Sequence, residues 1–127
     1  MPEVLLSPQL DSSLQSFSYL DGIVYPNKPD LEEFIQNHRE NVPLIQYACN
    51  AAISVFEGSA QLSLEVKYDP ESSDITLFLT ARQEHYSDNF DDILDKITSI
   101  RRMCRSSGLA HTDDFHVMTD GQPPLEL

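Results

Sequence analysis

The sequence predicts an α+β domain in which a small antiparallel sheet is covered on one face by helices. Residues 61–83 contain two runs that alternate between apolar and polar residues on either side of a turn-forming segment, which is typical of a β-hairpin. Residues 87–108 repeat apolar residues three and four positions apart, which is typical of an amphipathic helix. With two shorter helices before the hairpin and a short last strand, the expected order is helix, helix, strand, strand, helix, strand, in one domain of residues 1–127.

The hairpin prediction extends to the pairing of individual residues. If Tyr68 pairs with Ile75 across the turn, Leu64 lies opposite Leu79, and every large aliphatic side chain of the two strands falls on one face. A shift of one residue would scatter these side chains, so the pattern specifies this register. The second face then carries a mostly polar row with one aromatic residue: Ser63, Glu65, Lys67, Thr76, Phe78, Thr80 and Arg82.

The long helix is expected to cover the aliphatic face of the hairpin. Its apolar stripe consists of Phe90, Ile93, Leu94, Ile97, Ile100 and Cys104. Arginines are expected to occupy its last turn, where they complement the helix dipole, and Gly108 to end it. These arginines, the only basic cluster in the chain, are Arg101, Arg102 and Arg105.

Two shorter helices are expected before the hairpin. Asp30 is the predicted N-cap of the first, because Glu33 three residues later completes a capping box, and this helix is expected to end near Arg39. The second is expected to have Asn41 as its cap and Pro43 in its first turn, and to stop at Gly58, since glycine is common just after a helix. The sequence therefore predicts two helices in succession without a strand between them.

The two ends of the chain have weaker patterns. Residues 1–28 are predicted to be either an arm that lies on a partner or a short hairpin, because Asp21-Gly22 suits a tight turn. Residues 115–119 are expected to form a last strand, placed beside the first strand of the hairpin and parallel to the second. Residues 121–127 form a tail whose two prolines exclude it from a central strand.

Composition limits the classes of function. The chain of 127 residues has 8 basic and 21 acidic residues and a net charge of −13, which repels nucleic acid and anionic membranes and favours basic partners. Cys49 and Cys104 belong to no metal or redox motif, so we expect buried thiols in a reducing compartment. Because we find neither a signal-peptide pattern nor an apolar segment of membrane-spanning length, the sequence predicts a cytoplasmic protein.

Roughly the C-terminal half of the chain resembles a loosely defined set of small uncharacterised bacterial proteins. The shared pattern is an LSLEV-type strand, a D-P-E turn, a second strand ending in Arg-Gln, a helix and a T-D-x-x-P-P tail. The matching positions are Leu62–Val66, Asp69-Pro70-Glu71, Leu77, Leu79, Arg82-Gln83, Thr119-Asp120 and Pro123-Pro124. The chain departs from the pattern at Gly121-Gln122, where an aromatic–basic pair is more usual. The resemblance implies a bacterial domain that is not an established enzyme, and it transfers no catalytic residue.

Two clusters contain residue types that carry chemistry in other proteins. The segment from His111 to His116 has imidazoles and carboxylates, but its spacing matches no metal motif, so we expect a solvated connector. The segment Glu84-His85-Tyr86 has no nucleophile, phosphate loop or oxyanion element beside it and is expected to be a surface turn. We therefore assign no catalytic residue, no metal and no cofactor.

Arg82 is the residue most open to two interpretations. If the last strand runs parallel to the second strand of the hairpin, Arg82, Gln83 and Asp120 meet at one end of the sheet, and an Arg82–Asp120 ion pair is the expected structural outcome. The D-P-E turn lies at the other end of the hairpin, roughly 25 Å away at about 3.3 Å per residue. The turn and Arg82 therefore cannot form one small-molecule site.

The sequence favours a non-enzymatic, acidic protein-interaction module, dimeric or bound to another protein, for example of an antitoxin, immunity or regulatory type. Its expected interaction surface is the sheet face, or an edge strand, with the residues Glu65, Lys67, Phe78 and Arg82. The alternative is a small enzyme or a ligand- or metal-binding domain that uses Arg82, His85, Asp114, His116 and Asp120, with a ligand site at Arg82, Gln83, His85 and Asp120. Nucleic-acid binding ranks third.

Overall fold

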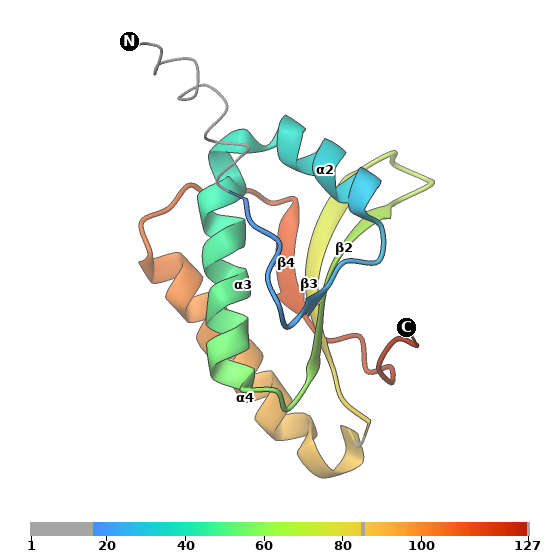
Figure 1. Ribbon diagram of the computed structural model, residues 1–127, viewed down its shortest axis with the longest axis vertical. Coiled ribbons are helices and arrows are strands. Elements are labelled where there is room, and N and C mark those ends of the chain that lie inside the picture. Colours follow the sequence, from blue (N-terminus) through green and yellow to red (C-terminus); the bar gives the residue numbers. More distant parts are fainter. Residues whose placement is uncertain (1–16, 85, 127) are drawn as a thin grey trace.

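The computed structural model describes residues 17–84 and 86–126. In these residues a four-stranded sheet packs against three α-helices, which confirms the predicted α+β class (Figure 1). The elements, in chain order, are β1 (Ile23–Val24), α2 (Lys28–Asn37), the 3-10 helix η1 (Arg39–Asn41), α3 (Val42–Phe56), β2 (Gln61–Tyr68), β3 (Ile75–Arg82), α4 (Tyr86–Ser106) and β4 (Phe115–Met118).

The sheet is mixed, so the prediction of a purely antiparallel sheet is wrong. Its strand order is β1-β2-β3-β4, with β1 parallel to β2, β2 antiparallel to β3, and β3 parallel to β4. Helices separate the strands of each parallel pair: α2 and α3 lie between β1 and β2, and α4 lies between β3 and β4. A connecting helix returns the chain to the end of the sheet from which it left, so the next strand runs in the same direction.

The last strand lies at a different edge from the one predicted. β4 pairs with β3, with Phe115 opposite Leu77, and its predicted parallel orientation to β3 is confirmed. It cannot lie beside β2, because β1 occupies that edge through the pairs of Ile23 with Leu62 and of Val24 with Ser63. The additional strand β1 also changes the predicted order of elements, which begins with a strand rather than a helix.

The prediction of a short N-terminal hairpin is wrong for the described part of residues 1–28. Residues 1–16 lie outside the described residues. Asp21-Gly22 does form a turn, with Gly22 at a φ of 97° and the Ile23 N–H donating to the Leu20 carbonyl. Residues 17–20, however, form no strand. Their side chains instead join an edge-to-face cluster of Phe17, Tyr19 and Tyr25, which competes with strand pairing.

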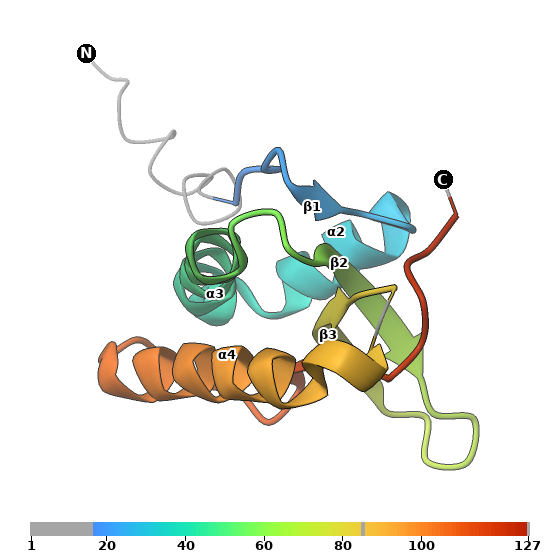
Figure 2. The same cartoon turned by 90° about the horizontal axis from the view of Figure 1, so that it is seen from below.

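The central hairpin has the predicted register at every position that was specified. Tyr68 pairs with Ile75, and Leu64 pairs with Leu79. Both leucines are buried on the face that carries the helices, where α3 and α4 lie side by side (Figure 2). The hairpin is therefore the scaffold on which the rest of the fold is assembled.

The first two helices differ from the prediction mainly at their starts. α2 begins three residues earlier than expected because Asn27, not Asp30, is its N-cap: the Asn27 side chain accepts a hydrogen bond from the Asp30 N–H. α2 ends at Asn37 rather than near Arg39. The start of α3 after Asn41 is confirmed, and the helix ends where the backbone turns left-handed at Glu57.

α4 buries a narrower stripe than predicted. Ile93, Ile97 and Ile100 are buried, but Phe90 and Leu94 are 44% and 40% exposed. The start of α4 extends past the end of the sheet (Figure 1). Leu94 is rotated by about 100° from Ile93 and so faces away from the core. The helix also ends two residues before Gly108, which leaves only Arg105 of the three arginines in its last turn.

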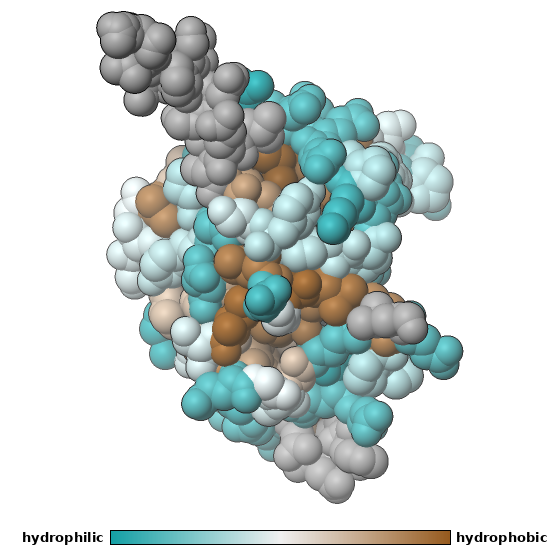
Figure 3. Space-filling model, in the orientation of Figure 1, coloured by the Kyte–Doolittle hydropathy of each residue, from teal (hydrophilic) through white to brown (hydrophobic). Residues whose placement is uncertain are grey.

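The two cysteines are buried and unpaired, as predicted. Burial raises the pKa of the Cys49 thiol to about 12, so this thiol stays protonated at neutral pH. Apolar side chains from the N-terminal segment and α3, including Leu20 and Ile53, pack against the core, and apolar residues also gather on the face shown in Figure 3. Among the described residues, no helix combines the length and the apolar character needed to cross a lipid bilayer.

Candidate functional site

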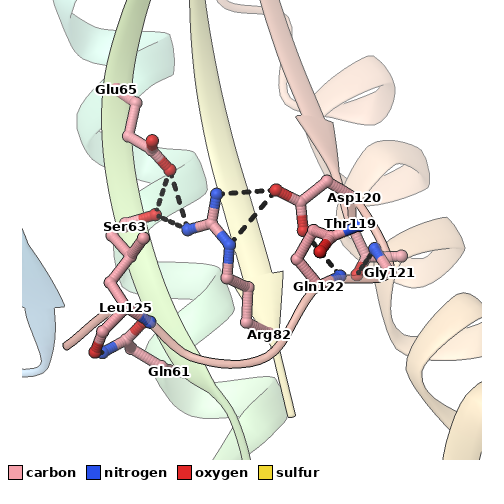
Figure 4. Close-up of polar contacts among 9 residues, drawn as sticks. All are labelled: Gln61, Ser63, Glu65, Arg82, Thr119, Asp120, Gly121, Gln122 and Leu125. Carbon is pink, nitrogen blue, oxygen red and sulfur yellow. Dashed lines mark hydrogen bonds and ion pairs between the residues drawn. The ribbon is translucent and has the colours of Figure 1, made fainter.

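Arg82 lies at the end of β3, on the face of the sheet opposite the helices, and links three segments of the chain (Figure 4). Its Nη1 donates to Ser63 Oγ at 2.8 Å and to Glu65 Oε2 at 2.9 Å. Its Nε and Nη2 both donate to Asp120 Oδ2, at 3.2 and 2.7 Å. The predicted Arg82–Asp120 ion pair is thus confirmed, and Glu65 is a second carboxylate partner that the sequence did not indicate.

The same network fixes the C-terminal tail across the end of the sheet. After Asp120, the tail reaches β2, where the Leu125 N–H donates to Gln61 Oε1 at 2.7 Å and Gln61 Nε2 donates to the Leu125 carbonyl at 3.1 Å. Asp120 Oδ1 also accepts a hydrogen bond from the Gln122 N–H. The tail joins no strand, as its prolines predict, but side chains at both ends hold it on the sheet.

The electrostatics of this network keep Arg82 and Asp120 charged. Burial by itself would raise the pKa of the Asp120 carboxyl, but hydrogen bonds from Arg82 and the Gln122 N–H outweigh it and hold the pKa below its ordinary value. Burial would lower the pKa of Arg82, and its hydrogen bonds to Asp120 and Glu65 raise it instead. Since Arg82 is only 3% exposed and already uses most of its donors, it is a structural residue rather than a free ligand-binding group.

The lowered pKa of Asp120 predicts a pH-dependent contribution to stability. A carboxyl whose folded-state pKa is depressed stabilises the fold above its unfolded-state pKa of about 3.9 and loses this contribution as the pH falls through the folded value. We therefore expect Asp120→Asn to be less stable than the wild type at neutral pH and equal to it in strong acid. Urea unfolding of both proteins across this pH range measures the difference, and a difference that is constant with pH would contradict the account.

A cleft of about 570 Å³ lies beside the Arg82 network. It is lined by residues from the α3–β2 connection, the ends of β2 and β3, α4 and the tail: Gly58, Ser59, Ala60, Gln61, Arg82, Gln83, Glu84, Asp92 and Pro124. Gln83 is 8% exposed, and its Nε2 donates to the Ser59 carbonyl. Its buried Oε1 has no hydrogen-bond partner within the described residues. Gln83, which lines the cleft, thus has one unsatisfied acceptor that is buried from solvent.

Phe78 occupies the part of the sheet face nearer the hairpin turn. It pairs with Glu65 on β2 and with His116 on β4. The His116 ring stacks on the Phe78 ring with centroids 5.8 Å apart, and Lys67 Nζ lies 5.8 Å from the centroid of Phe78. We call Lys67, Phe78 and His116 the Phe78 row; both flanking side chains are exposed and Phe78 is half-buried.

The predicted interaction surface is therefore only partly available. Glu65, Lys67, Phe78 and Arg82 do share one face of the sheet, but Arg82 is buried under the network that holds the tail. His116 also belongs to this surface, although the sequence analysis predicted it only as part of the alternative enzyme or ligand site. The parallel pairing of β4 with β3 brings it there, and the sequence analysis missed this pairing because it placed the last strand beside the first strand of the hairpin.

The described residues of the predicted enzyme or metal site do not form one cluster, although Arg82 and Asp120 meet. Asp114 binds His38 instead, with Nε2 and Oδ2 3.1 Å apart, while Asp120 is paired with Arg82. Asp114 and Asp120 precede and follow β4, and six residues at about 3.3 Å place them roughly 20 Å apart. His85 lies outside the described residues. Across the described ranges, no group of three or more His, Cys, Asp or Glu side chains is arranged to hold a metal ion.

The His38–Asp114 contact is a structural link that the sequence reasoning missed. His38 caps the end of α2, where its Nδ1 lies 2.9 Å from the Phe34 carbonyl oxygen and its ring stacks on Phe34 with centroids 3.9 Å apart. Together with a hydrogen bond from Asn41 to the Ala110 carbonyl, it joins the first half of the chain to the segment before β4. No local signal predicts a contact between residues 76 positions apart.

Comparison of this chain with known proteins found no matching protein family, no matching curated protein and no matching solved structure. The resemblance to small bacterial proteins therefore stays a prediction. Function has to be inferred from the geometry of the Phe78 row, the Arg82 network and the cleft beside it.

Proposed function

We propose that the protein is a non-enzymatic interaction module that binds a protein partner, or a second copy of itself, through the sheet face around the Phe78 row. The observation that carries the proposal is a half-buried aromatic ring set between two exposed side chains, Lys67 and His116. The helices pack on the opposite face (Figure 2), and the tail is held near the Gln61–Arg82 end of the sheet. The Phe78 row therefore lies away from the helices and away from the tail.

Physical chemistry supports an interface at this position. An aromatic ring contributes a large contact area at a small cost in conformational entropy, so aromatic residues are frequent at the centres of interfaces. Glu65, Lys67, Thr76 and His116 surround Phe78 with polar groups of the kind found at interface rims. The side chains that an enzyme would need, Arg82, Asp114 and Asp120, are engaged in contacts that stabilise the fold.

Net charge and motif content give the proposal a more specific form. A chain with a net charge of −13 attracts basic surfaces over long range, which suits an antitoxin, immunity or regulatory protein that neutralises a basic partner. The resemblance to small bacterial proteins and the buried, unpaired cysteines support a place in a bacterial cytoplasm. The basic partner and the bacterial cytoplasm are both parts of the proposal.

Phe78→Ser is expected to abolish partner capture without unfolding the protein. The substitution removes the ring that the partner would cover and leaves the Arg82 network in place. The measurement is affinity purification of the full chain from its native host together with the oligomeric state of the purified protein. Phe90→Ser is the matched control, because it removes another aromatic ring from the surface of α4. If the wild type is monomeric and Phe78→Ser retains every captured partner, the proposal is wrong.

A second candidate function is the binding of a small ligand in the cleft beside Arg82. It is favoured by the buried Gln83 Oε1, which lacks a donor among the described residues. Rotation of the Gln83 side chain toward the cleft would let a ligand with an amide or amine N–H satisfy this acceptor, and Glu84 and Asp92 at the cleft wall also favour a donor or a cation. Thermal stabilisation by such compounds, lost in Gln83→Met, distinguishes this function from protein binding.

A further inference from the structure

A small basic pocket lies between the last turns of α4 and the outer edge of β4. Its volume is about 170 Å³. Arg101 and Arg105 line it from α4, and His111 and His116 line it from the segment that contains β4. Cys104 and Phe115, both buried, form apolar parts of its wall, and no described acidic residue lines it. The proposed protein-binding function does not use Arg101, Arg105 or His111.

The two arginines are not accounted for by contacts within the chain. Arg101 donates its Nε to the Val117 carbonyl of β4 at 2.9 Å, which orients the guanidinium at the mouth of the pocket. Its two Nη groups, and the whole Arg105 guanidinium, make no hydrogen bond or ion pair with a described residue. The helix dipole accounts for Arg105 in the last turn of α4, but it does not account for Arg101, which is held by β4 rather than by the helix end.

The lining of the pocket, rather than the lack of a partner, sets Arg101 and Arg105 apart. Of the 8 basic residues, Arg82 and Lys96 have carboxylate partners and Lys28 and Lys67 lie over aromatic rings, while Arg39 and Arg102, like Arg101 and Arg105, have no carboxylate partner among the described residues. Arg101 and Arg105 differ from the other basic residues because both line one pocket that has no described acidic residue in its wall. Such a lining suits an anion from outside the chain.

We propose that this pocket binds a small oxyanion, a phosphate or a carboxylate group, through Arg101 and Arg105. The planar fork of N–H donors in each guanidinium matches two oxygens of such a group. His111 supplies a further N–H donor at the same pocket. The buried Cys104 and Phe115 reduce solvation next to the ion, which strengthens its attraction to the arginines compared with an open surface.

Thermal unfolding of the full chain in sodium phosphate, sodium acetate and sodium chloride at equal ionic strength tests the proposal. We expect phosphate or acetate to raise the melting temperature above the value in chloride, and the stronger of the two identifies the preferred group. Arg105→Gln is expected to weaken the derived affinity by at least about fivefold, since it removes charge-assisted hydrogen bonds. Arg102→Gln is the matched control, because it makes the same change of charge on an exposed residue of α4 that does not line the pocket.

Arg101→Gln is a second variant. Because Arg101 also donates a hydrogen bond to β4, the fold of this variant is checked separately. Chemical shifts of the Arg101 and Arg105 side-chain N–H groups that move with phosphate or acetate and not with chloride would support the site. Equal effects of all three salts would overturn the proposal. The proposal would also be overturned if Arg102→Gln lost as much affinity for the anion as Arg105→Gln, because the effect would then be one of net charge. Neither result depends on whether the Phe78 row binds a protein.

Discussion

Arg82→Met is expected to lower the free energy of unfolding by about 3 kcal/mol, because breaking a buried ion pair leaves the remaining charges without a partner. The substitution keeps an unbranched apolar stem but removes every hydrogen bond to Ser63, Glu65 and Asp120. The Glu65 and Asp120 side chains are only 15% and 23% exposed, so solvent compensates them poorly. Urea unfolding measures the effect as a lower midpoint with an unchanged slope.

Two comparisons isolate the cause of this loss. The triple variant Arg82→Met, Glu65→Gln and Asp120→Asn removes the uncompensated charges and is expected to recover part of the stability. Arg102→Met, on the exposed side of α4, is expected to stay within about 0.5 kcal/mol of the wild type. A stability of Arg82→Met equal to that of Arg102→Met would show that the network does not hold the sheet and tail together.

Ile97→Ala is expected to cost about 2–5 kcal/mol, because it leaves a cavity where α4 packs on the core. Ile97 is 2% exposed, between Ile93 and Ile100, which are also buried. Leu94→Ala, three residues earlier on the same helix, is expected to cost less than about 1 kcal/mol, since Leu94 faces solvent and alanine favours helix formation. Chemical denaturation of both variants compares the two positions, and similar losses would place Leu94 in the core, as the sequence pattern predicts.

The central hairpin could be predicted in detail because its information is local. Residues 61–83 contain both strands and the turn, and a shift of one residue from the observed register would place Leu64 and Leu79 on opposite sides. The same reasoning failed for β1. Ile23–Val24 is too short to show an alternating pattern, and its partner on β2 lies about forty positions away along the chain. Without β1, the free edge of β2 appeared to be the natural place for the last strand.

The candidate site shows the same division between local and distant information. The meeting of Arg82 with Asp120 followed from the predicted direction of the last strand, and the structure contains it. The position of His116 beside Phe78 depends on the register between β3 and β4, which no turn of fixed length sets. The contact of His38 with Asp114 depends on how α2 meets the segment before β4. Neither the β3–β4 register nor the contact between α2 and the segment before β4 can be predicted from a pattern within one stretch of sequence.

The most direct test of the proposed function is hydroxyl-radical footprinting of the full chain, free and in complex with its partner or at concentrations where it self-associates. Side-chain oxidation reports exposure at Phe78 and His116, and Phe90 on α4 serves as an internal reference. The proposal predicts that oxidation of Phe78 and His116 falls severalfold in the complex while that of Phe90 is unchanged. Undiminished oxidation of Phe78 in a complex that protects another surface would contradict it.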